Sequence, residues 1–295
     1  MFYFTEFPQF AYDWWTRWGF VYPACFAAAC IAAFAYGACL GSFMNVCIWR
    51  MPRGESVVHA PSHCTKCGAH IRWYDNLPVV SYIALRGRCR SCHAPYSPRY
   101  FAVEVLCGAL FVAVLIKCGL TRQVPGAMLF YCVALLFVVA GAWIDAVHRI
   151  IPDKLTFPAM VIALAASVLL PEVWGTESRL RAAGYSLLSG VLPGAFLWLF
   201  SFLGARICRR DVMGLGDVKF AAALGMLLGL PGAVFSLLFG SLAGALAGGV
   251  CCLVRRRSAA GYAIPFGPFL GAGALVWVFA GNLIVHWMLE RGFRL

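Results

Sequence analysis

Charged residues are scarce in this chain, and acidic residues are the scarcest. Only 12% of the residues are charged, with 12 Asp and Glu against 24 Lys and Arg, whereas 62% are hydrophobic and 30 are glycine. This composition excludes an ordinary soluble domain, in which about 25% of the residues are charged. We therefore expect a protein that resides in a lipid bilayer.

Long polar stretches are also few, because apolar runs occupy most of the chain. A membrane-spanning helix needs about 20 mainly apolar residues. Eight runs fit this description, which predicts an all-α polytopic membrane protein with about eight transmembrane helices. The runs lie near residues 22–48, 99–120, 124–144, 154–171, 183–205, 218–230, 232–254 and 267–289. Pro231-Gly232 marks either a tight turn between two of these helices or a kink within one longer helix. No internal repeat is evident.

The net charge of +12 does not indicate nucleic-acid binding, because the cations cluster in short loops between apolar runs. With the N-terminus outside, most of them fall on the inner side of the membrane, as the positive-inside rule requires. The run Arg255–Arg257 fits this pattern only if the segments 218–230 and 232–254 are separate helices. We expect this arrangement and no nucleic-acid partner.

One long polar stretch interrupts the apolar runs and suggests three domains. Residues 1–49 form an N-terminal segment with the first transmembrane helix, and residues 50–98 form a small cytoplasmic domain inserted after it. Residues 99–295 form the remaining transmembrane domain.

The polar stretch contains a C-x2-C-x21-C-x2-C motif. Four thiolates at this spacing suit a tetrahedral structural zinc ion. Two disulfides are the alternative, which a reducing inner compartment disfavours. Nearby histidines could replace a thiolate, but four cysteines already complete the coordination shell. The predicted ligands are Cys64, Cys67, Cys89 and Cys92, and the nearby histidines are His59, His63, His70 and His93.

Two of the few acidic residues, Asp145 and Asp217, stand where apolar runs meet polar turns, the second within Gly214–Asp217. Ionisable groups at membrane depth usually face a water-filled cavity or a partner. The expected topology places both at the inner boundary of the membrane. Two close carboxyl groups cannot both ionise easily, so one keeps a proton and the other acts as a base, as in aspartic proteases. This predicts a proteolytic pair.

Local sequence leaves other roles open for these acids. Asp145 could be a helix C-terminal residue that Arg149 satisfies, and Asp217 could cap the helix that follows it. Asp153, directly after Pro152, is better explained as such a cap. An alternative function is therefore a non-enzymatic membrane assembly or transport protein with a zinc docking module.

Several further motifs accompany the cysteines and the two aspartates in a fixed order along nearly the whole chain. They are Gly41–Val46 with Arg50–Pro52, Asp75–Pro78 with Ser81-Tyr82, Leu85–Cys89, Arg99-Tyr100 with Val103-Glu104, Ile151–Asp153, Gly214–Lys219 and Pro265–Pro268. No single motif is specific, but in combination they resemble the type IV prepilin peptidases. These are bifunctional leader peptidases and N-methyltransferases of bacterial inner membranes.

The resemblance implies a GxGD-type membrane aspartic protease with Asp145 and Asp217 as its catalytic pair. Such an enzyme cleaves the basic leader of type IV prepilins or pseudopilins after a glycine. It then methylates the new N-terminal residue with S-adenosylmethionine as methyl donor. The implied location is the bacterial inner membrane, with the zinc domain and both acids at the cytoplasmic side. Residues 50–98 hold no Gly-rich nucleotide fingerprint, so the donor site rests on the resemblance, with Glu55, Asp75 and Glu104 as candidate polar contacts.

Overall fold

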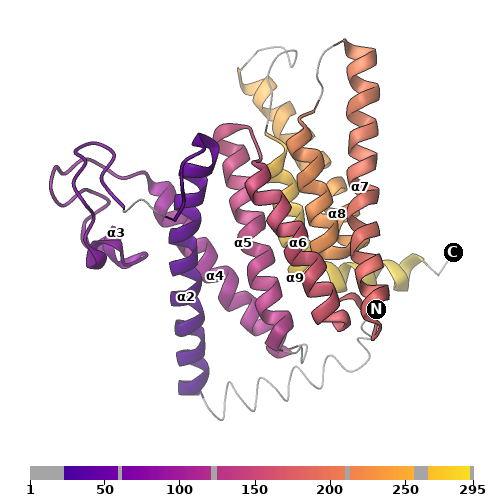
Figure 1. Ribbon diagram of the computed structural model, residues 1–295, viewed down its shortest axis with the longest axis horizontal. Helices are drawn as coiled ribbons and strands as arrows, with labels where there is room; N and C mark the ends of the chain where they lie inside the picture. The colour runs from indigo at the N-terminus through magenta and orange to yellow at the C-terminus, as the bar shows by residue number, and fades with distance from the viewer. Residues whose placement is uncertain (1–22, 59–61, 121–124, 210–212, 256–264, 293–295) are drawn as a thin grey trace. The chain divides into compact units, whose positions relative to one another are not determined.

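Helices make up most of the described chain, as the apolar runs predict. The structure is a computed structural model that describes residues 23–58, 62–120, 125–209, 213–255 and 265–292. Within these ranges there is no β-strand, and two isolated β-bridges are present. The helices are α2 (Pro23–Arg50), α3 (Val80–Ala84), α4 (Pro98–Leu120), α5 (Pro125–His148), α6 (Asp153–Leu169), α7 (Arg179–Cys208), α8 (Leu215–Arg255) and α9 (Gly267–Gly292) (Figure 1). The expected all-α class is confirmed.

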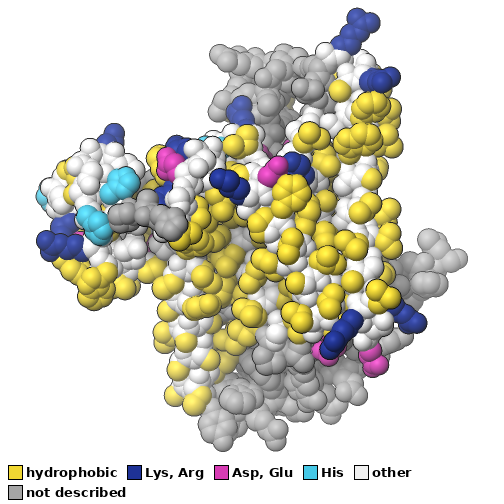
Figure 2. Space-filling view, viewed as in Figure 1, with side chains coloured by type: hydrophobic (Ala, Val, Ile, Leu, Met, Phe, Trp, Pro, Cys, Tyr) yellow, Lys and Arg dark blue, Asp and Glu magenta, His cyan; other side chains and the backbone are white. Residues whose placement is uncertain are grey.

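Six helices in the described residues are long and apolar enough to cross a membrane, namely α2, α4, α5, α7, α8 and α9. Helix α6 has 17 residues and is slightly shorter. Many large apolar side chains are exposed on the flanks of these helices (Figure 2). Ile31, Leu188 and Phe196 are among the exposed residues. Such flanks suit a hydrocarbon solvent rather than water. A polytopic membrane protein is thus confirmed, whereas the number of crossings stays a prediction.

The chain divides into two compact units, residues 2–136 and 137–295, and α5 contributes to both. In the first unit, α2 packs against α4 through small residues. A Cβ on Gly37 would lie 2.7 Å from the Cys107 carbonyl oxygen, and one on Gly41 would lie 2.9 Å from the Cys107 side chain. Glycines four residues apart let two helix backbones approach closely. The polar insert, residues 50–98, connects these two helices.

In the second unit, α7 and α8 also approach through glycine. A Cβ on Gly225 would lie 1.8 Å from the carbonyl oxygen of Ser189, and one on Gly190 would lie 2.4 Å from the side chain of Met226. The Ser186 hydroxyl donates a hydrogen bond to the Met226 carbonyl across the same contact, at 3.2 Å. Small residues therefore set the distance between these helices.

Helix α8 is interrupted at Gly229, whose φ of 76° and ψ of 167° are not helical. This backbone region is essentially accessible only to glycine. The sequence places the break at Pro231-Gly232, and the structure places the conformational change two residues earlier. Pro231 follows the break and cannot donate the hydrogen bond that a continuous helix would need.

The two halves of α8 run in opposite directions. The first half starts with Gly216 packed against Ile151, just after the end of α5. In the second half, Gly244 approaches Phe269 near the start of α9, and the start of α9 is hydrogen-bonded to the end of α5. Both ends of α8 therefore lie at the same end of this unit. The segments 218–230 and 232–254 are separate helical segments, as the Arg255–Arg257 run indicates.

Replacing Gly229 with alanine should destabilise the protein by about 1–3 kcal/mol, because alanine is strained in this backbone conformation. Steric crowding plays no part, since the nearest atom to the new Cβ would be Pro231 Cδ at 3.8 Å. The thermal unfolding midpoint of the detergent-solubilised protein measures the effect. Gly249→Ala is the matched control, since Gly249 is helical with open space around it and alanine is a better helix former. An unchanged midpoint for Gly229→Ala would contradict the prediction.

Candidate active site and metal centre

Asp145 lies in the last turn of α5, and it is only 5% exposed. Its Oδ2 accepts a hydrogen bond from the backbone N–H of Gly267 at 2.8 Å, which ties the end of α5 to the start of α9. A Cβ at position 267 would lie 2.8 Å from Asp145 Oδ2 and 2.9 Å from Asp145 Cβ. Only glycine therefore lets this backbone N–H reach the carboxylate. The sequence marks Gly267 as part of a motif but predicts no role for it.

Asp217 lies in the first turn of α8, in the same unit. Asp145 is close enough for its charge to act on Asp217, so the fold brings the two acids of the predicted pair near each other. Gly216 allows close packing beside the pair, since a Cβ there would lie 3.3 Å from the backbone nitrogen of Ile151. Asp217 Oδ1 is enclosed and has no hydrogen-bond partner among the described residues. A buried carboxylate oxygen without a hydrogen-bond partner is available to accept a hydrogen bond from a water molecule or a substrate.

The local sequence allows capping roles for Asp145 and Asp217, and the structure shows further contacts for Asp145 and a different position for Asp217. The carboxylate of Asp145 is bonded to α9, and the backbone N–H of Arg149 bonds instead to the Asp145 carbonyl oxygen at 2.8 Å. Asp217 is the third residue of α8 and not its cap. The prediction that Asp153 caps a helix is wrong as well, because α6 has no side-chain cap bond. Asp153 Oδ1 forms an ion pair with Lys219 Nζ at 2.6 Å.

In the first unit, the four predicted cysteine ligands come together. The sulfur atoms of Cys64, Cys67, Cys89 and Cys92 all lie within 4.8 Å of one another, and those of Cys64 and Cys92 are 3.8 Å apart. Tetrahedral coordination with metal–sulfur bonds of about 2.3 Å requires sulfur–sulfur distances of about 3.8 Å. These cysteines are free thiols, so the disulfide alternative is not adopted. The cluster could hold a metal ion.

No described histidine belongs to this cluster. His63, His70 and His93 are exposed, which agrees with their interpretation as surface residues. His59 lies outside the described residues.

The two cysteine pairs sit on the same backbone turn, because the structure of residues 62–71 is repeated at 87–96. In each turn the N–H of the first cysteine, Cys64 or Cys89, donates to the carbonyl oxygen five residues later, at 2.9 Å in both. One isolated β-bridge closes each turn. The sequence shows no internal repeat because the two stretches share only their cysteines and one alanine.

Backbone N–H groups favour the thiolate form of the first cysteine in each turn. Hydrogen bonds from the residues that follow Cys64, above all Cys67, lower the pKa of its thiol. The corresponding bonds after Cys89, above all from Cys92, lower the pKa of the Cys89 thiol to about 6. Thiolates, not thiols, are the metal-binding form of cysteine. Each turn therefore favours the metal-binding form of its first cysteine.

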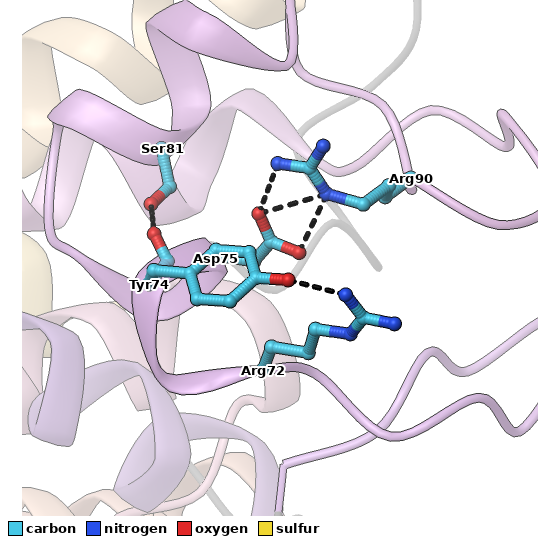
Figure 3. A network of polar contacts seen from close by, with 5 residues as sticks. All are labelled: Arg72, Tyr74, Asp75, Ser81 and Arg90. Carbon is cyan, nitrogen blue, oxygen red and sulfur yellow. Dashed lines mark hydrogen bonds and ion pairs between the residues drawn. The ribbon is translucent and has the colours of Figure 1, made fainter.

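A network of polar contacts joins the second metal turn to the short helices of the insert (Figure 3). Arg90 donates to both carboxylate oxygens of Asp75 at 2.6–3.1 Å, and these bonds lower the pKa of the Asp75 carboxyl group. Arg72 donates to the Tyr74 hydroxyl, and the Ser81 hydroxyl donates to the Tyr74 carbonyl at 2.9 Å. Asp75 therefore braces the insert.

A second polar cluster lies between α2 and α4. The Glu104 carboxylate accepts a hydrogen bond from the Val79 N–H at 2.8 Å and another from Ser42. The Asn45 side-chain amide donates to the Tyr100 carbonyl at 3.0 Å, and Asn45 Oδ1 is buried without a partner in the described part of the chain. Asn45 stands in a motif of the sequence, but its contact with α4 depends on helix packing.

The sequence matches two family models, the Bacterial Peptidase A24 N-terminal domain over residues 35–118 and the Type IV leader peptidase family over residues 132–249. A prepilin leader peptidase/N-methyltransferase of Myxococcus xanthus is 36% identical, over 76% of this chain and 64% of that protein. Proteins of the same name from Xanthomonas campestris and Pseudomonas aeruginosa are each 32% identical. These alignments cover 89% and 88% of this chain and 96% and 93% of the relatives. No solved structure matches.

The repeated turn predicts opposite effects for two substitutions at equivalent positions. Gly68 and His93 both have positive φ, 71° and 55°, a region that costs most L-residues about 1–2 kcal/mol. Gly68→Ala should therefore weaken metal binding about fivefold to thirtyfold, and His93→Gly should strengthen it, because metal binding is coupled to folding of the turns. Chelator competition on the purified protein measures both changes.

Gly54→Ala is the matched control for Gly68→Ala. Gly54 has a φ of 72° and, like Gly68, open space where a Cβ would lie, but it is outside the metal turns. Its substitution should leave the metal affinity unchanged. Equal effects of Gly54→Ala and Gly68→Ala would rule out the proposed role of the turn.

Proposed function

The chain belongs to the type IV leader peptidase family, and we propose that it cleaves the basic leader of type IV prepilins or pseudopilins after a glycine. The observation that supports this proposal is that Asp145 and Asp217, at two helix ends of the second unit, are close enough to interact electrostatically. Relatives that align with most of the chain are named prepilin leader peptidase/N-methyltransferase. No finding favours the alternative of a membrane assembly or transport protein.

Asp145 and Asp217 form the proposed catalytic pair. Of two close carboxyl groups, one keeps its proton and the other acts as a base. The base takes a proton from a water molecule as the water oxygen attacks the scissile carbonyl carbon. The acid gives its proton to the amide nitrogen, which leaves as an amine when the C–N bond breaks. The Gly267 N–H orients Asp145, and Asp217 Oδ1 has the unused hydrogen-bonding capacity to hold the water.

The position of this pair suits a substrate that is anchored in the membrane. Asp145 stands where α5 ends and Asp217 where α8 begins, so both lie at the end of an apolar helix. In the proposed orientation this end faces the cytoplasm of a bacterium, together with the insert 50–98 that follows the segment 1–49 and precedes 99–295. A basic leader stays on that side by the positive-inside rule. The scissile bond, between leader and hydrophobic helix, then lies at the level of the acids.

The second proposed step is methylation of the new N-terminal amine, which the names of the relatives support. S-adenosylmethionine supplies an activated methyl group when bound. We place its site in the first unit, where Asn45 Oδ1 is buried with no described partner and fits a ligand that donates a hydrogen bond. Among the acids that the sequence suggested, Asp75 and Glu104 already have partners and Glu55 is exposed.

Zinc is the ion that best fits the four-cysteine cluster. It prefers four sulfur ligands in tetrahedral geometry, and the distance of 3.8 Å between the sulfurs of Cys64 and Cys92 agrees with that geometry. The ion would act structurally, because four protein ligands leave no open coordination position. It would hold the two turns of the insert together.

Metal analysis of the purified protein should find about one zinc ion per chain. Cys64→Ser and Cys89→Ser should each reduce this content, because each removes one ligand. Cys39→Ser is the matched control, since Cys39 is an exposed thiol on α2 and distant in sequence from the motif. An iron content, or a zinc content that does not respond to Cys64→Ser, would refute the assignment.

Asp145→Asn and Asp217→Asn should each reduce cleavage of a prepilin precursor by about 10²–10⁴-fold, because an amide can neither accept nor supply the proton in the reaction. Appearance of the cleaved pilin on co-expression or in detergent measures the effect. Asp153→Asn is the matched control, because Asp153 is an exposed acid of the same unit that is paired with Lys219. The Asp153→Asn variant should cleave the precursor as the unaltered protein does.

The same variants supply their own folding control. Given a precleaved pilin peptide and labelled S-adenosylmethionine, Asp145→Asn and Asp217→Asn should still transfer the methyl group, since the donor site is proposed in the other unit. Processing that persists in either variant would eliminate the pair as the catalytic acids. Absence of transfer by the unaltered protein would remove the methylation step from the proposal.

A further inference from the structure

The insert carries large apolar side chains that are exposed in spite of its polar composition. Trp73 is 79% exposed, Val80 61%, Ile83 63% and Leu77 45%. Their spacing of three or four residues places them along one stretch, the apolar segment 73–83, which includes helix α3. In Figure 2, hydrophobic side chains gather at the edge of the insert over the region that Figure 1 labels α3. A cluster of this kind on an otherwise polar module marks an interaction surface.

The apolar segment is firmly held and is not a frayed loop. Arg90 clamps Asp75 with two-pronged hydrogen bonds, and the Ser81 hydroxyl bonds to the Tyr74 carbonyl (Figure 3). The first contact attaches the segment to the second metal turn, and the second joins its two short helices to each other. Its apolar side chains are therefore exposed in a fixed arrangement.

A hydrogen bond also ties the middle of the segment to a transmembrane helix. The Val79 N–H donates to the Glu104 carboxylate of α4 at 2.8 Å. Val79 has a φ of 63° and a ψ of −52°, and the following N–H bonds to the Pro78 carbonyl at 2.6 Å, which makes a γ-turn. This turn is strained for a β-branched residue. The bond to Glu104 compensates for that strain and fixes the position of the turn.

The attachment point lies at membrane depth. Glu104 follows Pro98, the first residue of α4, by six positions, which is about 9 Å along a helix that rises about 1.5 Å per residue. The whole of α4 has 23 residues and is about 34 Å long, little more than the hydrocarbon thickness of about 30 Å. A point about 9 Å inside α4 therefore lies at or below the boundary between headgroups and acyl chains.

Aromatic and basic residues mark the level of that boundary independently. Arg99 lies over the rings of Tyr100 at 5.1 Å and Trp49 at 6.0 Å, at the start of α4 and the end of α2. Aromatic rings beside a basic residue are typical of the membrane–water interface. Glu104 lies more than one helical turn further into the membrane than this group.

The apolar segment also continues the lipid-facing surface of α2. Glu104 bonds both Val79 and Ser42, so the neighbours of these residues in sequence, Val80 and Phe43, lie near the same level. Both are exposed. Arg72 and Arg86, also exposed, border the apolar segment on either side in the sequence and suit lipid phosphates.

We propose that the apolar segment 73–83 is an interfacial membrane anchor whose partner is the phospholipid bilayer. Trp73, Leu77, Val80 and Ile83 enter the boundary between headgroups and acyl chains, while the metal turns stay on the aqueous side. A protein partner is disfavoured because the attachment through Glu104 holds the segment at a depth where lipid surrounds the helices. The insert is thus fastened to the bilayer by its own surface as well as by α2 and α4.

Photo-crosslinking in lipid nanodiscs tests this proposal on the full chain. The nanodiscs contain phosphatidylcholine and phosphatidylglycerol, with a phosphatidylcholine that carries a diazirine within one acyl chain. Trypsin cuts after Arg72 and Arg86 and releases residues 73–86 as one peptide, and it releases residues 67–72 and 91–99 of the metal turns as internal controls. Lipid adducts should be several-fold more frequent on peptide 73–86 than on either control peptide.

A double substitution, Val80→Glu with Ile83→Glu, should abolish most adducts on this peptide without changing metal content, because two carboxylates oppose insertion. Lys66→Gln with Arg88→Gln changes two exposed residues of the metal turns and should leave the adducts unchanged. Absence of adducts on peptide 73–86 in the unaltered protein, while the transmembrane helices are labelled, would overturn the proposal. Crosslinking of this peptide to a second copy of the chain, or equal labelling of the Glu variant, would overturn it as well.

Discussion

The structure depends on one constraint: a polar group at membrane depth must find a partner inside the protein, because lipid offers none. The Asp145 carboxylate meets the Gly267 N–H, the Glu104 carboxylate meets the Val79 N–H, and the Ser186 hydroxyl meets a carbonyl of the neighbouring helix. Each of these bonds also fixes how two segments pack. Against this background, the enclosed Asp217 Oδ1 is conspicuous, since it has no described partner. The constraint thus separates polar groups that hold the fold from Asp217 Oδ1 and Asn45 Oδ1, which are buried without a partner among the described residues.

Glycine makes these polar contacts possible in both units. Helices approach so closely at Gly41 and Gly225 that a methyl group would overlap the neighbouring backbone or side chain, and at Gly267 it would displace the Asp145 carboxylate.

The polar insert is stabilised differently, because a module of this size buries too little apolar surface to fold by hydrophobic burial alone. Its two cysteine turns, the Asp75–Arg90 pair and the anchoring bond from Glu104 take the place of a core. The membrane-spanning helices and the insert are thus stabilised by different kinds of contact.

The sequence predicted the helices well because a transmembrane helix is a local property of composition. Each of the eight apolar runs lies almost entirely within a helix of the structure. The cysteine cluster could be predicted equally well, because the spacing of the four cysteines in the sequence indicates a metal site. The role of Asp153 was misjudged, because its partner Lys219 lies far away in sequence and a helix cap is the commoner use of an aspartate after proline. The repeat of the metal turn was missed because hydrogen bonds, not side chains, define it.

Composition and spacing alone determined that this chain is a helical membrane protein with a four-cysteine insert and two aspartates at helix ends. Each of these features depends on residues that are close in sequence, so it can be predicted without knowledge of helix packing. Only the tertiary structure decided that α8 reverses at Gly229, that Asp145 is bonded to Gly267, and that the apolar side chains of the insert are held at the depth of Glu104. These features arise from backbone torsions and from atoms brought together across a long stretch of chain. A pattern in the sequence specifies which groups are present, whereas the packing of helices specifies which of them meet.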